Sequence, residues 1–93
     1  MKQIELVPAL ELGNKLNVDV IDFPDGRRRK RCGITLEYAP RDVRELQSQG
    51  MDREAMLAYY RQRVYDLVKV NISQDWECTG GMEEVLAIVE KYI

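Results

Sequence analysis

The sequence predicts an α+β fold in which a three-stranded antiparallel β-meander is followed by three α-helices packed on its one apolar face. Two observations indicate this class. In the first part of the chain apolar residues alternate with polar ones, as in half-buried strands, and after Tyr38 they recur with helical spacing. With 93 residues, 45% of them hydrophobic, the chain is long enough for one core, so residues 1–93 are expected to form a single domain.

The first strand is expected over residues 4–12, at an edge of the sheet. Pro8 lacks the N–H group that a ladder of hydrogen bonds needs, and proline is confined to edge strands for that reason. A short helical turn over residues 8–15 is the alternative conformation. In the strand conformation the side chains on the inner side are Ile4, Leu6, Leu10 and Leu12.

The loop after this strand decides which side chains turn inward. A two-residue turn at Gly13-Asn14 would place Glu11 opposite Leu16 and send the wrong face of the strand inward. A three-residue loop that includes Lys15 places Leu12 opposite Leu16 instead. Because burial should outweigh turn preference, the three-residue loop is predicted.

Residues 16–36 are expected to form a β-hairpin around Pro24-Asp25-Gly26. Proline presets φ for the first turn position, aspartate tolerates the second, and glycine adopts the left-handed third. A three-residue loop made of these residues sets the register of the hairpin. The predicted pairs are Val18 with Cys32, Asp22 with Arg28, and Asp19 with Arg31.

Five consecutive cationic residues follow this turn: Arg27, Arg28, Arg29, Lys30 and Arg31. One interpretation is a basic hairpin that binds nucleic acid, because clustered cations release counterions and arginine matches phosphate geometry. The favoured interpretation is a solvated strand rim, in which carboxylates oppose two of the cations and the charges prevent edge-to-edge aggregation. The net charge of −2 also argues against a polyanion as partner.

Three helices are expected in the second half of the chain. Pro40 is suited to the first position of a short helix that Gly50 ends, and Asp52 is suited to cap a longer one running to about residue 72. Residues 75–81 are expected to be a connection. The last helix, over residues 82–93, is too short to be stable alone and must dock on the rest of the chain.

The long helix is expected to have more apolar surface than the sheet can cover. Leu57, Tyr60, Val64, Leu67 and Val68 form the arc that faces the sheet. Beside it lies a second group, here called the helix flank: Met56, Tyr59, Arg63 and Val70. The favoured cover for this flank is the C-terminal helix, and the alternative is a partner chain, because Tyr, Met and Arg are enriched at interfaces.

The residue types present give no indication of catalysis. The chain has no histidine, which excludes a Ser-His or Cys-His nucleophile, a His-ligated zinc and an imidazole base. No CxxC, GxxxxGK or GxGxxG motif occurs. The sequence therefore predicts a protein that is not an enzyme and that binds no cofactor and no metal.

The predicted function is a small adaptor or regulatory protein that acts by binding another protein or by self-association. The alternative is nucleic-acid binding through the basic hairpin. Two distant cysteines, Cys32 and Cys78, and the absence of a signal-like or membrane-length apolar run predict a cytoplasmic protein that does not bind membranes.

Overall fold

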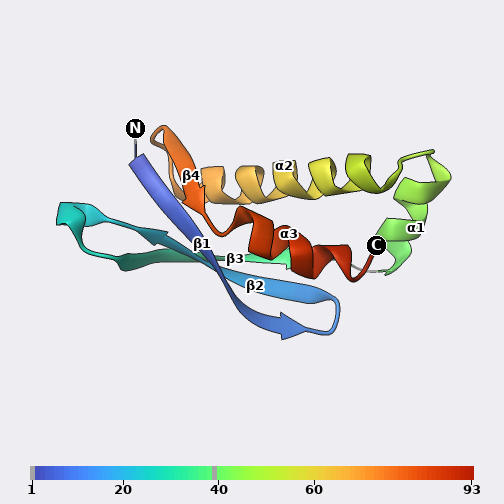
Figure 1. Ribbon diagram of the computed structural model, residues 1–93, viewed down its shortest axis with the longest axis horizontal. Coiled ribbons are helices and arrows are strands. Elements are labelled where there is room, and N and C mark those ends of the chain that lie inside the picture. Colours follow the sequence, from blue (N-terminus) through green and yellow to red (C-terminus); the bar gives the residue numbers. More distant parts are fainter. Residues whose placement is uncertain (1, 39) are drawn as a thin grey trace.

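A four-stranded mixed sheet and three helices make up the structure, a computed structural model that describes residues 2–38 and 40–93, with only the backbone of residues 40–42. Strands β1, β2 and β3 and helices α1 and α2 precede the last strand, β4, and the last helix, α3 (Figure 1). The sheet has the order β3-β2-β1-β4. The element bounds are Lys2–Leu12 (β1), Lys15–Asp22 (β2), Arg29–Glu37 (β3), Pro40–Ser48 (α1), Arg53–Asn71 (α2), Trp76–Gly80 (β4) and Met82–Glu90 (α3).

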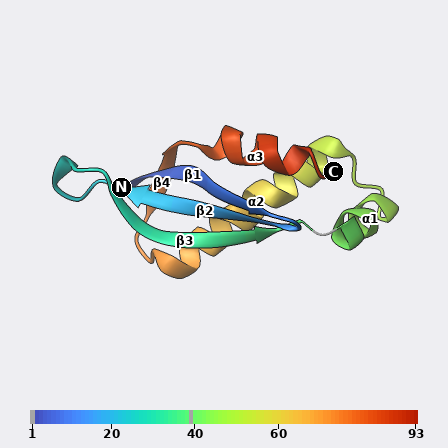
Figure 2. The ribbon, with the colours of Figure 1, turned by 90° about the horizontal axis from the view of Figure 1, so that it is seen from below.

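The predicted α+β class is confirmed, with helices α2 and α3 on one face of the sheet. Helix α3 lies against β1, and α2 lies against β3 and α3. Figure 2 looks onto the face of the sheet that these helices leave uncovered. One apolar core lies between the two layers, and its fully buried aliphatic side chains are Ile4, Leu16, Val18, Val20, Leu36, Val64, Val68, Ile72, Val85 and Val89.

The prediction of three antiparallel strands is wrong because Trp76–Gly80, expected to be a connection, is strand β4. It pairs in parallel with the first residues of β1, from Lys2 to Glu5. The Thr79 hydroxyl donates a hydrogen bond to the backbone oxygen of Ile4 at 3.1 Å. Strand β1 is therefore an inner strand along its first half. Pro8 lies beyond the paired part, where β1 has only β2 beside it, so the physical reason for the edge prediction holds locally.

The three-residue loop predicted between β1 and β2 is also wrong. Leu12 pairs with Lys15 across a two-residue Gly13-Asn14 turn, and the helical alternative for residues 8–15 is not formed. A β-bulge lies between Pro8 and Leu10, and its one extra residue reverses the side-chain alternation of β1. The two-residue turn can therefore form without turning the first half of β1 away from the core. Leu10 and Leu12 consequently face away from the helices, with 53% and 47% of their surface exposed.

The predicted register of the second hairpin is wrong by two residues, since Val18 pairs with Ile34. The loop is longer than predicted: residues 23–28 separate the last pair, Asp22 and Arg29. Within it Pro24–Gly26 forms a tight turn in which Asp25 and Gly26 both have positive φ, of 55° and 75°. A second bulge lies at the position of Arg31. Because a shift of two residues preserves the faces of a strand, the aliphatic side chains predicted to face inward, Leu16, Val18, Val20 and Ile34, still enter the core, whereas Arg28 and Lys30, predicted on the same face, are exposed.

The three predicted helices are present. Helix α1 begins at Pro40 and ends before Gly50, and the Asp52 side chain caps α2 by accepting a hydrogen bond from the Ala55 N–H at 2.8 Å. Helix α3 ends at Glu90, before the predicted residue 93. Of the apolar stripe that helical spacing predicts, it buries Met82, Val85, Leu86 and Val89, while Ile93, beyond its end, is only partly buried.

Candidate binding surfaces

The basic residues lie on the hairpin formed by β2 and β3, whose tip extends beyond the helices at one end of an elongated molecule (Figure 1). All five cationic side chains are exposed. Arg28 donates to Glu5 from Nε and Nη2 at 3.2 and 3.1 Å, and Lys30 forms an ion pair with Asp19 at 3.2 Å. Two of the five cations therefore face carboxylates, as expected, but in other pairs: Arg28 faces Glu5 and not Asp22, and Asp19 faces Lys30 and not Arg31. The other three, Arg27, Arg29 and Arg31, form no ion pair with any residue that the structure describes.

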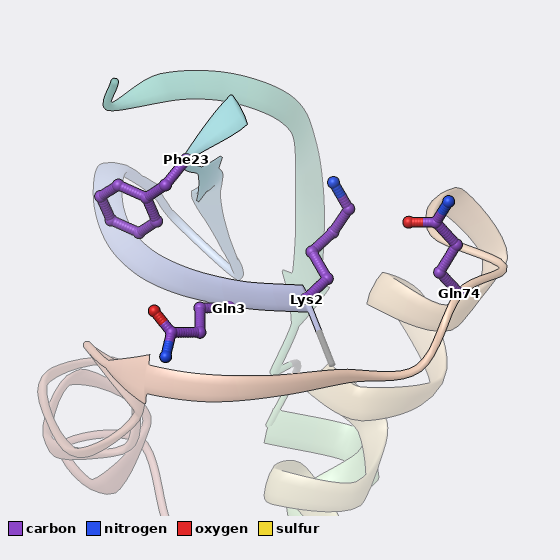
Figure 3. A pocket seen from close by; sticks show the side chains of 4 residues that line it. All are labelled: Lys2, Gln3, Phe23 and Gln74. Carbon is purple, nitrogen blue, oxygen red and sulfur yellow. The ribbon is translucent and has the colours of Figure 1, made fainter. Parts of the chain in front are cut away.

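Asp22 is the one buried charged residue in the described core, and it lies at the end of β2, next to the hairpin loop. The predicted pairing with Arg28 is replaced by an ion pair with Lys2, whose Nζ lies 3.3 Å from Oδ2 of Asp22. The side chain of Asp22 is 4% exposed and that of Lys2 is 24% exposed. A depression of about 450 Å³ opens beside this pair, and Figure 3 shows Lys2 between the phenyl ring of Phe23 and the amide of Gln74. Its lining also includes Gln3.

Replacing Lys2 by Met is expected to destabilise the protein by about 1–3 kcal/mol, because it leaves the buried Asp22 carboxylate without its cation. The control is Lys15→Met, which breaks the exposed Lys15–Glu37 pair at 3.8 Å and should cost less than about 0.5 kcal/mol. Urea unfolding followed by circular dichroism measures both changes. Equal losses in the two variants would show that burial of Asp22 does not matter.

The uncovered face of the sheet carries an apolar patch that was not predicted from the sequence. Leu10 and Leu12 lie two residues apart on this face of β1 and are about half exposed. A shallow depression of about 480 Å³ lies beside Leu10, where Gly33 contributes no side chain. The Thr35 hydroxyl donates to Oδ1 of Asn17 at 3.1 Å along its rim, and the Lys30–Asp19 ion pair lies at its other end. The one sequence signal for this surface was the turn preference of Gly13-Asn14, which was outweighed by the expected burial of the leucines.

The predicted helix flank is partly wrong. Met56 is 3% exposed and therefore buried, whereas Tyr59, Arg63 and Val70 are exposed, Val70 by 85%. The C-terminal helix does not cover these three residues. It packs on the other side of α2, where Arg61 forms an ion pair with Glu83 at 3.0 Å. Since Arg61 lies two positions from both Tyr59 and Arg63, it projects from nearly the opposite side of the helix.

Aromatic stacking and a hydrogen bond connect β4 and the residues after α3 to the rest of the fold. Tyr92 stacks on Tyr38 with ring centroids 4.2 Å apart, and its hydroxyl donates to Glu11 at 3.2 Å. Tyr65 of α2 stacks on Trp76 at 5.0 Å. The Tyr38 hydroxyl donates to the backbone oxygen of Lys15, and burial together with the nearby Tyr92 raises the pKa of Tyr38 to about 12. Tyr38 therefore stays protonated and keeps this bond throughout the neutral range.

Both cysteines are free, half-buried thiols. Burial raises the pKa of Cys32, although Arg31 partly opposes this effect. The Cys78 thiol donates to the backbone oxygen of Gly80 at 3.2 Å. Among the described residues no cluster of carboxylates and thiols could hold a metal ion. In the same part of the chain no helix combines the length and apolarity needed to cross a bilayer.

No protein-family model matches the sequence, and neither a curated protein nor a solved structure shows significant similarity to it. The surfaces described above are therefore the basis for a functional conclusion.

Proposed function

We propose that this chain is a small, non-enzymatic protein-binding module and that it binds its partner with the uncovered face of the sheet. The observation that carries this proposal is the exposure of two leucines, Leu10 and Leu12, side by side on a sheet face that no described helix covers. Exposed apolar patches framed by polar residues are typical of interaction sites.

The neighbourhood of the two leucines suits a protein partner. The depression at Gly33 can accept an apolar side chain, and its rim offers the Asn17 amide, the Thr35 hydroxyl and the charges of Lys30 and Asp19. This arrangement of an apolar centre and a polar rim is that of protein–protein interfaces. Burying the exposed half of each leucine would contribute about 1 kcal/mol. Because the sheet holds these side chains in place, little ordering cost would oppose binding.

The proposal is tested by capture from an extract of the native host with purified protein as bait, after nuclease treatment. Replacing Leu10 and Leu12 together by Ser is expected to abolish capture of the proteins that the wild type retains, while leaving the unfolding midpoint nearly unchanged. The control bait carries Arg27→Ala, Arg29→Ala and Arg31→Ala, and it should still capture the same proteins. Undiminished capture by the leucine variant would refute the proposed docking face.

Nucleic-acid binding by the basic hairpin is the second candidate, supported by the three arginines that form no ion pair with a described residue. If it holds, the triple variant of Arg27, Arg29 and Arg31 should weaken binding far more than Arg28→Ala with Lys30→Ala, because the latter two cations already face carboxylates. The log–log slope of affinity against salt should fall by about one unit for each phosphate that the variant no longer neutralises. Fluorescence anisotropy with labelled DNA and RNA at low salt measures this. No binding to either would exclude the candidate.

A further inference from the structure

Four exposed residues form a stripe along the side of α2 that faces away from α3: Tyr59, Arg63, Asp66 and Val70. At 100° per residue they fall within an arc of about 60°. On this side of α2 the sheet ends at its edge strand, β3. This set is here called the outer stripe.

The charges of the outer stripe are not satisfied by ion pairs within the described chain. Arg63 has no ion pair with any described residue, and the Asp66 carboxylate accepts a hydrogen bond from the neutral Gln62 amide at 3.0 Å. Val70 leaves 85% of its surface in water and Tyr59 leaves 44%. The stripe thus offers one cation, one anion, one aromatic ring and one aliphatic side chain.

The order of these residues is self-complementary. A two-fold axis that crosses α2 between Val64 and Tyr65 exchanges position 59 with position 70 and position 63 with position 66. A second copy of α2, placed antiparallel across this axis, would bring Tyr59 against the partner's Val70 and Arg63 against the partner's Asp66. Each contact would occur twice, as in any two-fold interface. Two apolar contacts, one at each end, would flank the two opposite-charge pairs at the centre.

We infer that the outer stripe is the interface of a homodimer. The occupant is a second copy of this chain, because its own sequence supplies both the charge complement and the apolar complement at matching positions. One crossing of two helices buries less surface than a standard interface, so the dimer is weak and depends on concentration. This inference goes beyond the proposed docking face, which lies on the opposite side of the sheet and would remain free in both copies.

Charge reversal tests the inference by sedimentation equilibrium of the purified protein. Arg63→Asp places a second carboxylate against the partner's Asp66, and Asp66→Arg places a second guanidinium against the partner's Arg63. Each variant alone should therefore self-associate at least about tenfold more weakly than the wild type. When the two variants are mixed, only the heterodimer has opposite charges at both central pairs, because one chain carries a carboxylate at both positions and the other carries a guanidinium at both. The mixture should therefore form heterodimers more tightly than either variant forms homodimers.

The matched control is Arg61→Asp, a charge reversal on the side of α2 that packs against α3, which should leave self-association unchanged. Circular dichroism verifies that each variant keeps its helices, and Val70→Asp provides a second variant with the same expected loss. A wild type that stays monomeric up to about 1 mM would overturn the inference. So would a mixture that associates no better than its components. The leucine double variant at positions 10 and 12 should dimerise normally, which separates this interface from the proposed docking face.

Discussion

Replacement of Gly81 by Ala is expected to destabilise the protein by about 3–5 kcal/mol, because the site combines left-handed backbone strain with a steric clash. Gly81 joins β4 to α3 and has a φ of 93°. A Cβ atom at this position would lie 1.7 Å from the backbone oxygen of Leu6, far inside van der Waals contact. The obstacle is the backbone of β1, so it cannot be relieved by rotating a side chain. Either β4 or the start of α3 must move away from β1.

Gly80 provides the matched control, one residue earlier. Its Cβ would lie 3.7 Å from Cγ of Glu5, an ordinary contact with a flexible side chain, and its φ is not in the left-handed region. Gly80→Ala should therefore change the stability by less than about 1 kcal/mol. Urea titration of both variants, monitored by circular dichroism, gives the comparison. Similar midpoints for the two would mean that the β4–α3 junction adapts without cost.

The core and the helices could be predicted because their signals are local. The Asp52 cap lies within one turn of the group that it satisfies, and alternation in β2 placed Val18 and Val20 inward whatever the register. The register itself could not be predicted. It depends on two bulges, near Leu10 and at Arg31, and each adds a residue that no local propensity marks.

Strand β4 was missed because its pairing is not local. Its apolar alternation is limited to Trp76 and Cys78, too few residues to distinguish a strand from a connection, and the backbone groups that β4 meets belong to the beginning of the chain, from Lys2 to Glu5. The outer position of β4 and its parallel pairing leave no trace in a single sequence. Because β4 was not expected, the edge position that Pro8 indicates was assigned to the whole of β1.

The candidate surfaces were predicted only in part. Leu10 and Leu12 were placed inward because burial was expected to outweigh turn preference, and Met56 was placed with Tyr59 on the helix flank. In the structure the two leucines are about half exposed, and Met56 is buried in the core. The basic hairpin was found from sequence because five adjacent cations need no tertiary information. Which of them face carboxylates depends on the register, so Arg31 was expected to have a partner and Lys30 was not.

Ending the chain at Gly81, which removes α3, is expected to abolish cooperative folding. The helix contributes four buried side chains to the core: Met82, Val85, Leu86 and Val89. Burial of each contributes about 1.5–3 kcal/mol, so their loss removes about as much free energy as typically stabilises a whole small protein. The core face of β1 would also lose the helix that lies against it. Thermal unfolding followed by circular dichroism and tryptophan fluorescence should show no cooperative transition.

A chain that ends at Glu90 separates the contribution of α3 from that of the residues after it. This chain keeps the four core side chains and the ion pair between Arg53 and Glu90. It loses the stacking of Tyr92 on Tyr38 and the bonds from Lys91 and Tyr92 to Glu11, for an expected cost of about 1–2 kcal/mol. It should therefore still unfold cooperatively, at a lower midpoint. Cooperative unfolding of the chain that ends at Gly81 would contradict this expectation, because it would show that α2 alone completes the core.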